Sequence, residues 1–194
     1  MQDGKIIIEG VPEDELVNFL INVPVNDSIT NTFDGLEFAV QHVFGESGFG
    51  AFANYTMVDA GADYNNLLLS GEFDNTELIG ATNDGVQAGI SDTANFVLFY
   101  ENYGVSARVA YNWRDEYLEG FGQGTGGNPT YVEEYSQIDF NVNYTFQSIE
   151  NLSVFVEGIN ITNEYRRKVG RSSSQVLNVT QQGARYSIGA RYTF

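Results

Sequence analysis

The chain has 194 residues, of which 21 are glycine, 3 are proline and 14% are aromatic, a composition that suits a strand-rich protein. Its net charge of -17 argues against nucleic acid as a partner, because phosphate binding needs a basic surface. The absence of cysteine excludes disulfides, thiolate-bound metals and a thiol nucleophile.

No apolar run approaches the roughly 18 residues that a transmembrane helix needs. Residues 1–9 lack both the basic leader and the long apolar core of a signal peptide, which predicts a trimmed chain or the tail end of a longer protein. We expect residues 1–194 to be a single partial domain, in which residues 1–15 are the remnant of a loop.

Strands are predicted wherever apolar and polar residues alternate between turn signals. The predicted strands are 33–43, 49–58, 93–101, 104–114, 135–146, 152–162 and 182–194. A further stretch, 16–25, is either a separate strand or the upper part of the first one. The sequence therefore predicts an all-β, antiparallel up-and-down meander of about seven or eight long strands.

The connections between these strands alternate in length. Tight turns at 44–48, 102–104 and 147–151 alternate with long polar stretches at 59–92, 115–134 and 163–181. Short turns at one rim and long loops at the other are typical of an outer-membrane barrel. The meander is therefore predicted to be part of a transmembrane β-barrel.

The two faces of the clearest strands differ in polarity. One face of 105–113, 138–146 and 186–194 carries no charged residue, and a Lys or Arg facing lipid at mid-depth costs about 2–4 kcal/mol. The opposite face is polar and is predicted to line a water-filled lumen. The lumen-facing candidates are Arg108, Arg114, Asp139, Asn141, Asn143, Glu157, Arg185 and Arg191.

A soluble antiparallel sheet also alternates, so the position of the aromatic residues matters. Tyr144, Phe146, Tyr192 and Phe194 fall at the short-turn end of the strands. The opposite end is predicted to carry Tyr111, Trp113 and Tyr186. Two aromatic girdles around an aliphatic band are typical of membrane strands, whereas a sandwich more often has its aromatic residues in its centre.

An ordered series of segments resembles the C-terminal barrel portion of TonB-dependent outer-membrane receptors. The segments are VPVN (23–26), GLEFAVQH (35–42), ANYTMVD (53–59), YENYGVSAR (100–108), YNWRDEY (111–117), IDFNVNY (138–144), VEGINITNE (156–164) and GARYTF (189–194). They span about residues 23 to 194 in the order of the family.

The resemblance implies a location in the outer membrane of a Gram-negative type of envelope and a parent function in uptake of a siderophore, cobalamin or carbohydrate. Such receptors are plugged barrels of about 22 strands. The implied partners are the lipid bilayer, the remaining strands and plug, the barrel assembly machinery, and TonB through the missing plug region. Tyr192 and Phe194 are similar to the family's terminal assembly signal.

Other motifs are weaker. The glycine-rich 122–127 matches a dinucleotide-binding pattern but lacks a following helix, which indicates an outer loop. His42 is expected to be a polar residue at a strand end, and 166–168 with Arg171 an exposed loop. The acidic residues of the first long connection match no calcium-loop pattern; they are Asp59, Asp63, Glu72, Asp74, Glu77, Asp84 and Asp92.

The arginines of the polar face are interpreted first as members of balanced ion pairs with Asp139 and Glu157. Contact with a plug or an anionic ligand is the alternative. We expect no catalytic, cofactor or metal site. Two other functions stay open: a small self-contained barrel acting as a pore or adhesin, and a soluble β-sandwich binding module.

Overall fold

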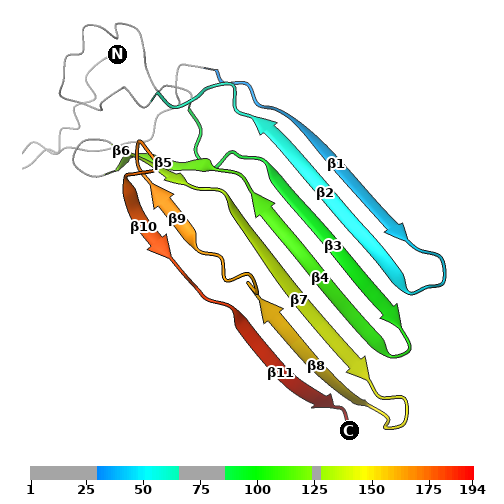
Figure 1. Ribbon diagram of the computed structural model, residues 1–194. Coiled ribbons are helices and arrows are strands. Elements are labelled where there is room, and N and C mark those ends of the chain that lie inside the picture. The colour runs from blue at the N-terminus through cyan, green and yellow to red at the C-terminus, as the bar shows by residue number, and fades with distance from the viewer. Residues whose placement is uncertain (1–29, 66–85, 124–127) are drawn as a thin grey trace, which may run out of the picture.

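The computed structural model describes residues 30–65, 86–123 and 128–194. Within these ranges the chain is all-β, with one antiparallel sheet of seven strands, another of four strands, and no helix (Figure 1). The predicted fold class is thus confirmed. The predicted loop remnant 1–15 and the ambiguous stretch 16–25 lie outside the described residues. Among those residues no helix is long and apolar enough to cross a membrane.

The seven-stranded sheet contains all seven strands predicted from alternation. In spatial order they are β1 (Asp34–Val43), β2 (Phe49–Asp59), β3 (Thr93–Asn102), β4 (Val105–Arg114), β7 (Tyr135–Thr145), β8 (Leu152–Ile159) and β11 (Arg185–Tyr192). Every neighbouring pair is antiparallel. Sequence neighbours pair except where β4 meets β7 and β8 meets β11, because further strands intervene in the chain.

Strand β8 ends three residues earlier than predicted, because Asn160 turns the chain. Asn160 has a φ of 54° and is 4% exposed. Its side chain accepts a hydrogen bond from the Glu164 amide at 2.9 Å and donates one to the Glu164 carbonyl at 2.9 Å. Its own amide donates to Oδ1 of Asp139 at 2.8 Å. The buried amide side chain therefore fixes a tight bend where β8 ends.

The shortest turn joins β3 and β4 through Tyr103 and Gly104 alone. Asn102 pairs directly with Val105, and the two turn residues have φ values of 51° and 79°. Two consecutive positive φ angles match the right-handed twist of a hairpin. A Cβ on Gly104 would lie 2.6 Å from the Thr145 carbonyl oxygen of β7, so the neighbouring strand also requires glycine here.

Two of the long connections form strands that the alternation of residues does not predict. They are β5 (Tyr117–Gln123), β6 (Asn128–Val132), β9 (Arg166–Val169) and β10 (Val176–Thr180). They form a four-stranded sheet in the order β10-β9-β6-β5, beyond the long-connection end of the main sheet (Figure 1). These strands are short and have irregular register between β5 and β6 and between β9 and β10, which explains why alternation did not reveal them.

Apolar side chains are buried on both sides of this second sheet. Leu118 and Val169, both paired with Tyr131, lie on one side and are 8% and 3% exposed, whereas Val132 lies on the other side and is 1% exposed. Val86, in the segment before β3, is 8% exposed. The Gly89 amide donates to the Leu118 carbonyl at 2.7 Å, which attaches the segment before β3 to β5. The first and second long connections are therefore held together at this point.

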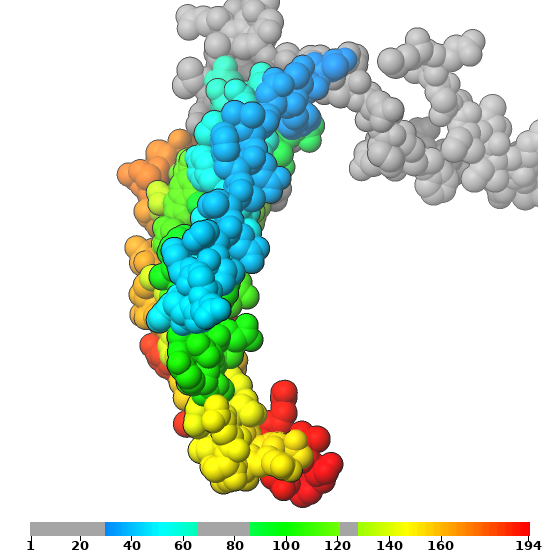
Figure 2. All heavy atoms as spheres, turned by 90° about the vertical axis from the view of Figure 1, so that its right-hand side faces the viewer, coloured from blue at the N-terminus to red at the C-terminus, as the bar shows by residue number. Residues whose placement is uncertain are grey.

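The seven-stranded sheet is a curved wall with two open edges. Figure 2 shows the wall from the side of β1, and Figure 1 shows β1 and β11 at its opposite sides. In the described part of the chain, β1 pairs only with β2, and β11 pairs only with β8. Both edges thus have backbone groups that pair with no strand among the described residues.

Candidate functional site

The sheet register brings the apolar side chains of all seven strands to one side. Directly paired residues point to the same side of a sheet, so one row runs from Ala51 through Leu98 and Val109 to Phe140. No Asp, Glu, Lys or Arg shares this side between the Leu36–Met57 row and the short turns. We call this surface the apolar face; its members include Leu36, Phe38, Val40, Ala51, Ala53, Phe96, Leu98, Ala107, Val109, Tyr111, Ile138, Phe140, Val142, Tyr144, Val154, Val156, Tyr186, Ile188 and Ala190.

Much of the apolar face is open. Val40 is 63% exposed, Leu98 49%, Val142 40% and Ile188 82%. Fully burying one such side chain stabilises a protein by about 1.5–3 kcal/mol. If the whole face is left in water, a stabilisation on the order of 10 kcal/mol is lost. That amount is comparable with the whole stability of a typical domain, about 5–15 kcal/mol. The face therefore requires an apolar covering.

Aromatic rings gather at the short-turn end of the apolar face. The rings of Tyr144 and Phe146 are 4.9 Å apart, and those of Tyr192 and Phe194 are 5.1 Å apart. Phe49 and Tyr100 form a third pair at 4.6 Å. This third pair was not predicted from the sequence, although the alternation of β2 and β3 places both residues on the apolar face.

A second aromatic group lies toward the long-connection end. The ring of Trp113 stacks on Tyr55 with their centroids 6.5 Å apart, and its indole nitrogen donates to Glu134 at 2.7 Å. Tyr186 contacts Phe140 at 6.4 Å, while Tyr111 is 37% exposed in the row of Phe96 and Ile138. An aromatic body with a polar tip suits the boundary between apolar and aqueous surroundings. The assignment of both groups as girdles stays a prediction.

The opposite side, which we call the polar face, carries the lumen-facing candidates. Its members include Glu37, Gln41, Asn54, Asn95, Glu101, Ser106, Arg108, Asn112, Arg114, Gln137, Asp139, Asn141, Asn143, Glu157, Arg185, Ser187 and Arg191. Asn95 donates to the side chain of Asn112, whereas the buried Oδ1 of Asn54 accepts no hydrogen bond from the residues that the structure describes. All eight lumen-facing candidates share this side.

The ion pairs expected between the arginines and Asp139 or Glu157 do not form. Arg108, Arg185 and Arg191 make no ion pair with any residue that the structure describes. Register explains the difference: Arg108 lies opposite Asn141, which separates it from Glu157 on the next strand. The Asp139 carboxylate instead accepts hydrogen bonds from the Gln137 side chain, at 2.6 and 2.9 Å, and from a backbone amide.

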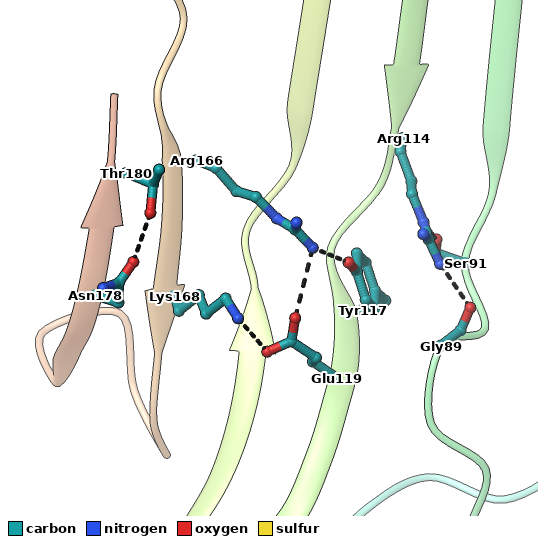
Figure 3. A network of polar contacts seen from close by, with 9 residues as sticks. All are labelled: Gly89, Ser91, Arg114, Tyr117, Glu119, Arg166, Lys168, Asn178 and Thr180. Carbon is teal, nitrogen blue, oxygen red and sulfur yellow. Dashed lines mark hydrogen bonds and ion pairs between the residues drawn. The ribbon is translucent and has the colours of Figure 1, made fainter. Parts of the chain in front are cut away.

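Arg114 belongs to a different environment from the other arginines. Its guanidinium donates to Ser91 Oγ at 2.8 Å and to the Gly89 carbonyl at 2.6 Å. It also lies 3.7 Å over the Tyr117 ring, a cation–π contact worth about 0.5–1 kcal/mol when exposed. Arg114 therefore joins the end of β4 to the connection before β3 and to the start of β5 (Figure 3).

A polar cleft of about 640 Å³ lies between this end of the main sheet and the second sheet. Its lining includes Arg114, Asp115, Tyr117, Glu133, Tyr135, Gln137, Glu164, Arg166, Lys168, Asn178, Thr180 and Gln182. Three basic side chains there balance three acidic ones, and the remaining polar groups are amides and hydroxyls. The cleft is therefore equipped to hydrogen-bond a small polar solute without a strong preference for either charge.

The basic segment predicted to be an exposed loop is instead β9, a central strand of the second sheet. Lys168 Nζ lies 2.6 Å from Glu119, and Arg166 contacts both Glu119 and the Tyr117 hydroxyl (Figure 3). Arg167 points to the other side and holds the Glu133 carboxylate through contacts of 2.8 and 3.0 Å. Acidic partners on β5 and after β6 thus fix a segment whose charge alone suggested a solvated loop.

A second, open cavity of about 940 Å³ lies at the long-connection end near β1 and β2. Asp34, Asp59, Asp63, Asp92 and Glu116 contribute to its lining. Desolvation raises the pKa of the Glu116 carboxyl, and the carboxylates of Glu133 and Asp115 raise it further. Among the residues described, no group of three or more His, Cys, Asp or Glu is arranged to hold a metal ion.

The other predicted features are only partly visible. Asp59, Asp63 and Asp92 line the cavity, whereas Glu72, Asp74, Glu77 and Asp84 lie outside the described residues. The glycine-rich 122–127 begins with the last two residues of β5, and its residues 124–127 lie outside the described residues. His42 lies at the end of β1 with its ring 4.8 Å from that of Phe44.

Comparison with known proteins adds no assignment: no protein-family model, no curated protein and no solved structure matches this chain.

Proposed function

We propose that this chain forms part of the wall of an outer-membrane barrel of the TonB-dependent receptor type, whose parent function is uptake of a scarce ligand. The observation that carries the proposal is the apolar face, which is uncharged across seven strands and open to its surroundings. Lipid acyl chains supply the apolar covering that this face requires. A charged residue there would cost about 2–4 kcal/mol, which accounts for the absence of charge.

The two ends of the sheet support the same proposal. The turns at 44–48, 103–104 and 146–151 lie at one end, and the long connections with their second sheet lie at the other (Figure 1). Outer-membrane barrels have short periplasmic turns and longer outer loops. The aromatic groups near both ends of the apolar face suit the two membrane interfaces.

The polar face supports a water-filled or protein-filled interior. Arg108, Arg185 and Arg191 are exposed and have no ion-pair partner among the described residues, so they need water or a further polar body beside them. A plug inside the barrel is such a body. Siderophore, cobalamin and carbohydrate all remain open as the ligand, since the polar cleft selects no charge.

A soluble β-sandwich accounts less well for the arrangement. In a sandwich a second sheet covers the apolar face of the first at about 10 Å. Here the four-stranded sheet lies beyond the long-connection end, and the large side chains of the apolar face remain exposed. In this proposal, lipid acyl chains cover the apolar face, which the second sheet leaves uncovered.

Flotation with lipid vesicles tests the proposal. We expect the 194-residue chain, refolded with phosphatidylcholine vesicles, to float with them and to stay bound at about 1 M salt, where exposed charges are screened within about 3 Å. Binding by acyl chains does not depend on charge, so the salt wash distinguishes it from electrostatic adsorption. A monodisperse chain that remains in the aqueous fraction would contradict the proposal.

A further inference from the structure

The two sheets meet at a joint formed by two short connections, one from β4 to β5 and one from β6 to β7 (Figure 1). The β4–β7 ladder ends at Arg114 opposite Tyr135, and the β5–β6 ladder begins at Tyr117 opposite Val132. Two residues separate the ladders on each chain segment. The register is therefore continuous across the joint, although neither ladder includes the joint residues.

Both chain segments change sides at this joint. Arg114 and Tyr117 line the same polar cleft although they are three residues apart, and so do Val132 and Tyr135. In a continuous strand, residues separated by an odd number of positions point to opposite sides of the sheet. Regular strand geometry is thus interrupted in both segments over the same two residues.

All four residues of the joint are acidic. They are Asp115 and Glu116 on one segment, and Glu133 and Glu134 on the other. The continuous register places Asp115 opposite Glu134, and Glu116 opposite Glu133. Like charges directly opposite each other destabilise an antiparallel pair. Charge repulsion therefore gives a physical reason for the break between the two sheets at this point.

These carboxylates are poorly balanced by cations. Glu133 pairs with Arg167 at 2.8 Å, whereas the other three make no ion pair within the part of the chain that the structure describes. The guanidinium of the adjacent Arg114 is directed elsewhere, toward the segment before β3 and the Tyr117 ring. Most of the negative charge at the joint is therefore uncompensated.

Glu116 also lines the open cavity near the ends of β1 and β2, whose described lining contains no Lys, Arg or His. The other carboxylates of that lining are Asp34, Asp59, Asp63 and Asp92. Desolvation raises the pKa of the Glu116 carboxyl, and Glu133 and Asp115 raise it further. The joint is therefore most stable when Glu116 is protonated, and this stability is lost as the pH rises through the raised pKa.

We infer that the four carboxylates form an electrostatic joint, at which the second sheet moves relative to the main sheet when they are ionised and is held in place when they are neutralised. Asp115 and Glu133 also line the polar cleft of about 640 Å³ between the sheets, so movement at the joint changes the width of the cleft. Acid or high salt tightens the joint, and neutral pH at low salt loosens it. The inference goes beyond the proposed function, because it concerns the two sheets whatever covers the apolar face.

Pulsed dipolar EPR between two spin labels tests the inference, because the chain contains no cysteine of its own. The joint pair combines Ser106→Cys on β4 with Val179→Cys on β10, where Val179 is 54% exposed. The reference pair combines Ser106→Cys with Ser187→Cys, both on the polar face of the main sheet. Full-length chains are measured in phosphatidylcholine vesicles at about pH 8 and about pH 4.5, which bracket the titration of a Glu with a raised pKa.

The double variant Glu116→Gln/Glu134→Gln removes one charge from each facing pair. It keeps the ion pair between Glu133 and Arg167. The new amide oxygen at position 134 can still accept the hydrogen bond from the Trp113 indole nitrogen. This variant therefore changes the charge of the joint and leaves its other contacts in place.

The control variant Glu37→Gln/Glu46→Gln removes two charges away from the joint. Glu37 lies opposite Thr56, and Glu46 lies in the turn between β1 and β2, so neither faces a carboxylate across a ladder. We expect this variant to match the unmodified chain for both label pairs.

For the joint pair of the unmodified chain, we expect a distance distribution that is broad at high pH. It narrows in acid, and also at about 1 M salt, where exposed charges are screened within about 3 Å. In Glu116→Gln/Glu134→Gln it is narrow already at high pH. The ratio of loosened to tightened joints falls there by roughly 2- to 30-fold, the equivalent of about 0.2–1 kcal/mol for each facing pair. The reference pair stays narrow throughout.

Equal widths for the unmodified chain and the double variant at high pH would overturn the inference, and so would an unchanged pH dependence in that variant. A broad reference pair at every pH would overturn it as well, since a joint requires a formed main sheet. Vesicle flotation tests the proposed function separately, and a chain that stays in buffer is measured there with the same labels.

Discussion

Val142→Lys is expected to reduce binding of the chain to lipid vesicles by roughly 30- to 900-fold, the equivalent of about 2–4 kcal/mol. Val142 lies in the middle of β7 on the apolar face and is 40% exposed. Its neighbours across the sheet are Ala107 and Val156, so the new ammonium group finds no counter-charge. Partition between vesicles and buffer measures the effect.

Asn141→Lys is the matched control. Asn141 precedes Val142 on the same strand, is also exposed, and points to the polar face opposite Glu157. The same charge at the same depth should therefore change vesicle binding by less than about 2.5-fold, because surface substitutions usually change a free energy by no more than about 0.5 kcal/mol. Equal losses in the two variants would contradict the assignment of the faces.

Gly104→Ala is expected to lower the free energy of unfolding by about 2–5 kcal/mol. The φ of 79° alone costs about 1–2 kcal/mol for a residue with a Cβ. The new methyl group would also lie 2.6 Å from the Thr145 carbonyl oxygen. The shifts that relieve such overpacking cost a further amount of about 1–3 kcal/mol. Urea unfolding in vesicles, followed by the fluorescence of Trp113, measures the loss.

Gly183→Ala separates the backbone cost from the overpacking cost in the expected loss of stability. Gly183 has nearly the same φ, 76°, but a Cβ there would meet nothing within 4 Å. We expect this variant to lose only the backbone cost of about 1–2 kcal/mol. Equal losses for Gly104→Ala and Gly183→Ala would show that the β3–β4 turn does not pack against β7 as described.

The long strands could be predicted because alternation with a period of two is a local property of the sequence. The bounds of β2, β3, β4 and β7 agree with the predicted ranges within one residue. Larger differences occur at β8, which ends three residues early, and at β11, which begins three residues later and ends two residues earlier than predicted. Asn160 ends β8 through hydrogen bonds with Asp139, which is 21 residues away in the chain, and with Glu164, which is four residues away. A period of two reveals neither partner.

The second sheet could not be predicted from alternation. Strand β9 has only four residues, and three of them are basic, so the segment resembled a solvated loop. Its partners Glu119 and Glu133 lie far away in the chain. Their pairing depends on β5 and β6 meeting β9, which is a tertiary effect.

Which charged side chains pair with each other could also not be predicted from the sequence. Alternation correctly assigned Arg108 and Glu157 to one side of the sheet, yet it contains no information on register between β4, β7 and β8. The actual register puts Asn141 between them. The glycines beneath aromatic rings could not be predicted for the same reason. A Cβ on Gly50 would overlap the ring of Phe99, and a Cβ on Gly189 would lie 2.5 Å from the ring of Phe155.

A nitroxide scan along β7 tests the membrane assignment most directly. Single cysteines at positions 137–144 of this cysteine-free chain are spin-labelled in vesicles, and their collisions with oxygen in lipid and with a nickel chelate in water are compared. We predict a period of two, with oxygen favoured at Ile138, Phe140, Val142 and Tyr144, and nickel favoured at Gln137, Asn141 and Asn143. If the apolar positions were inaccessible to both reagents, the face would be covered by protein, and the membrane assignment would be wrong.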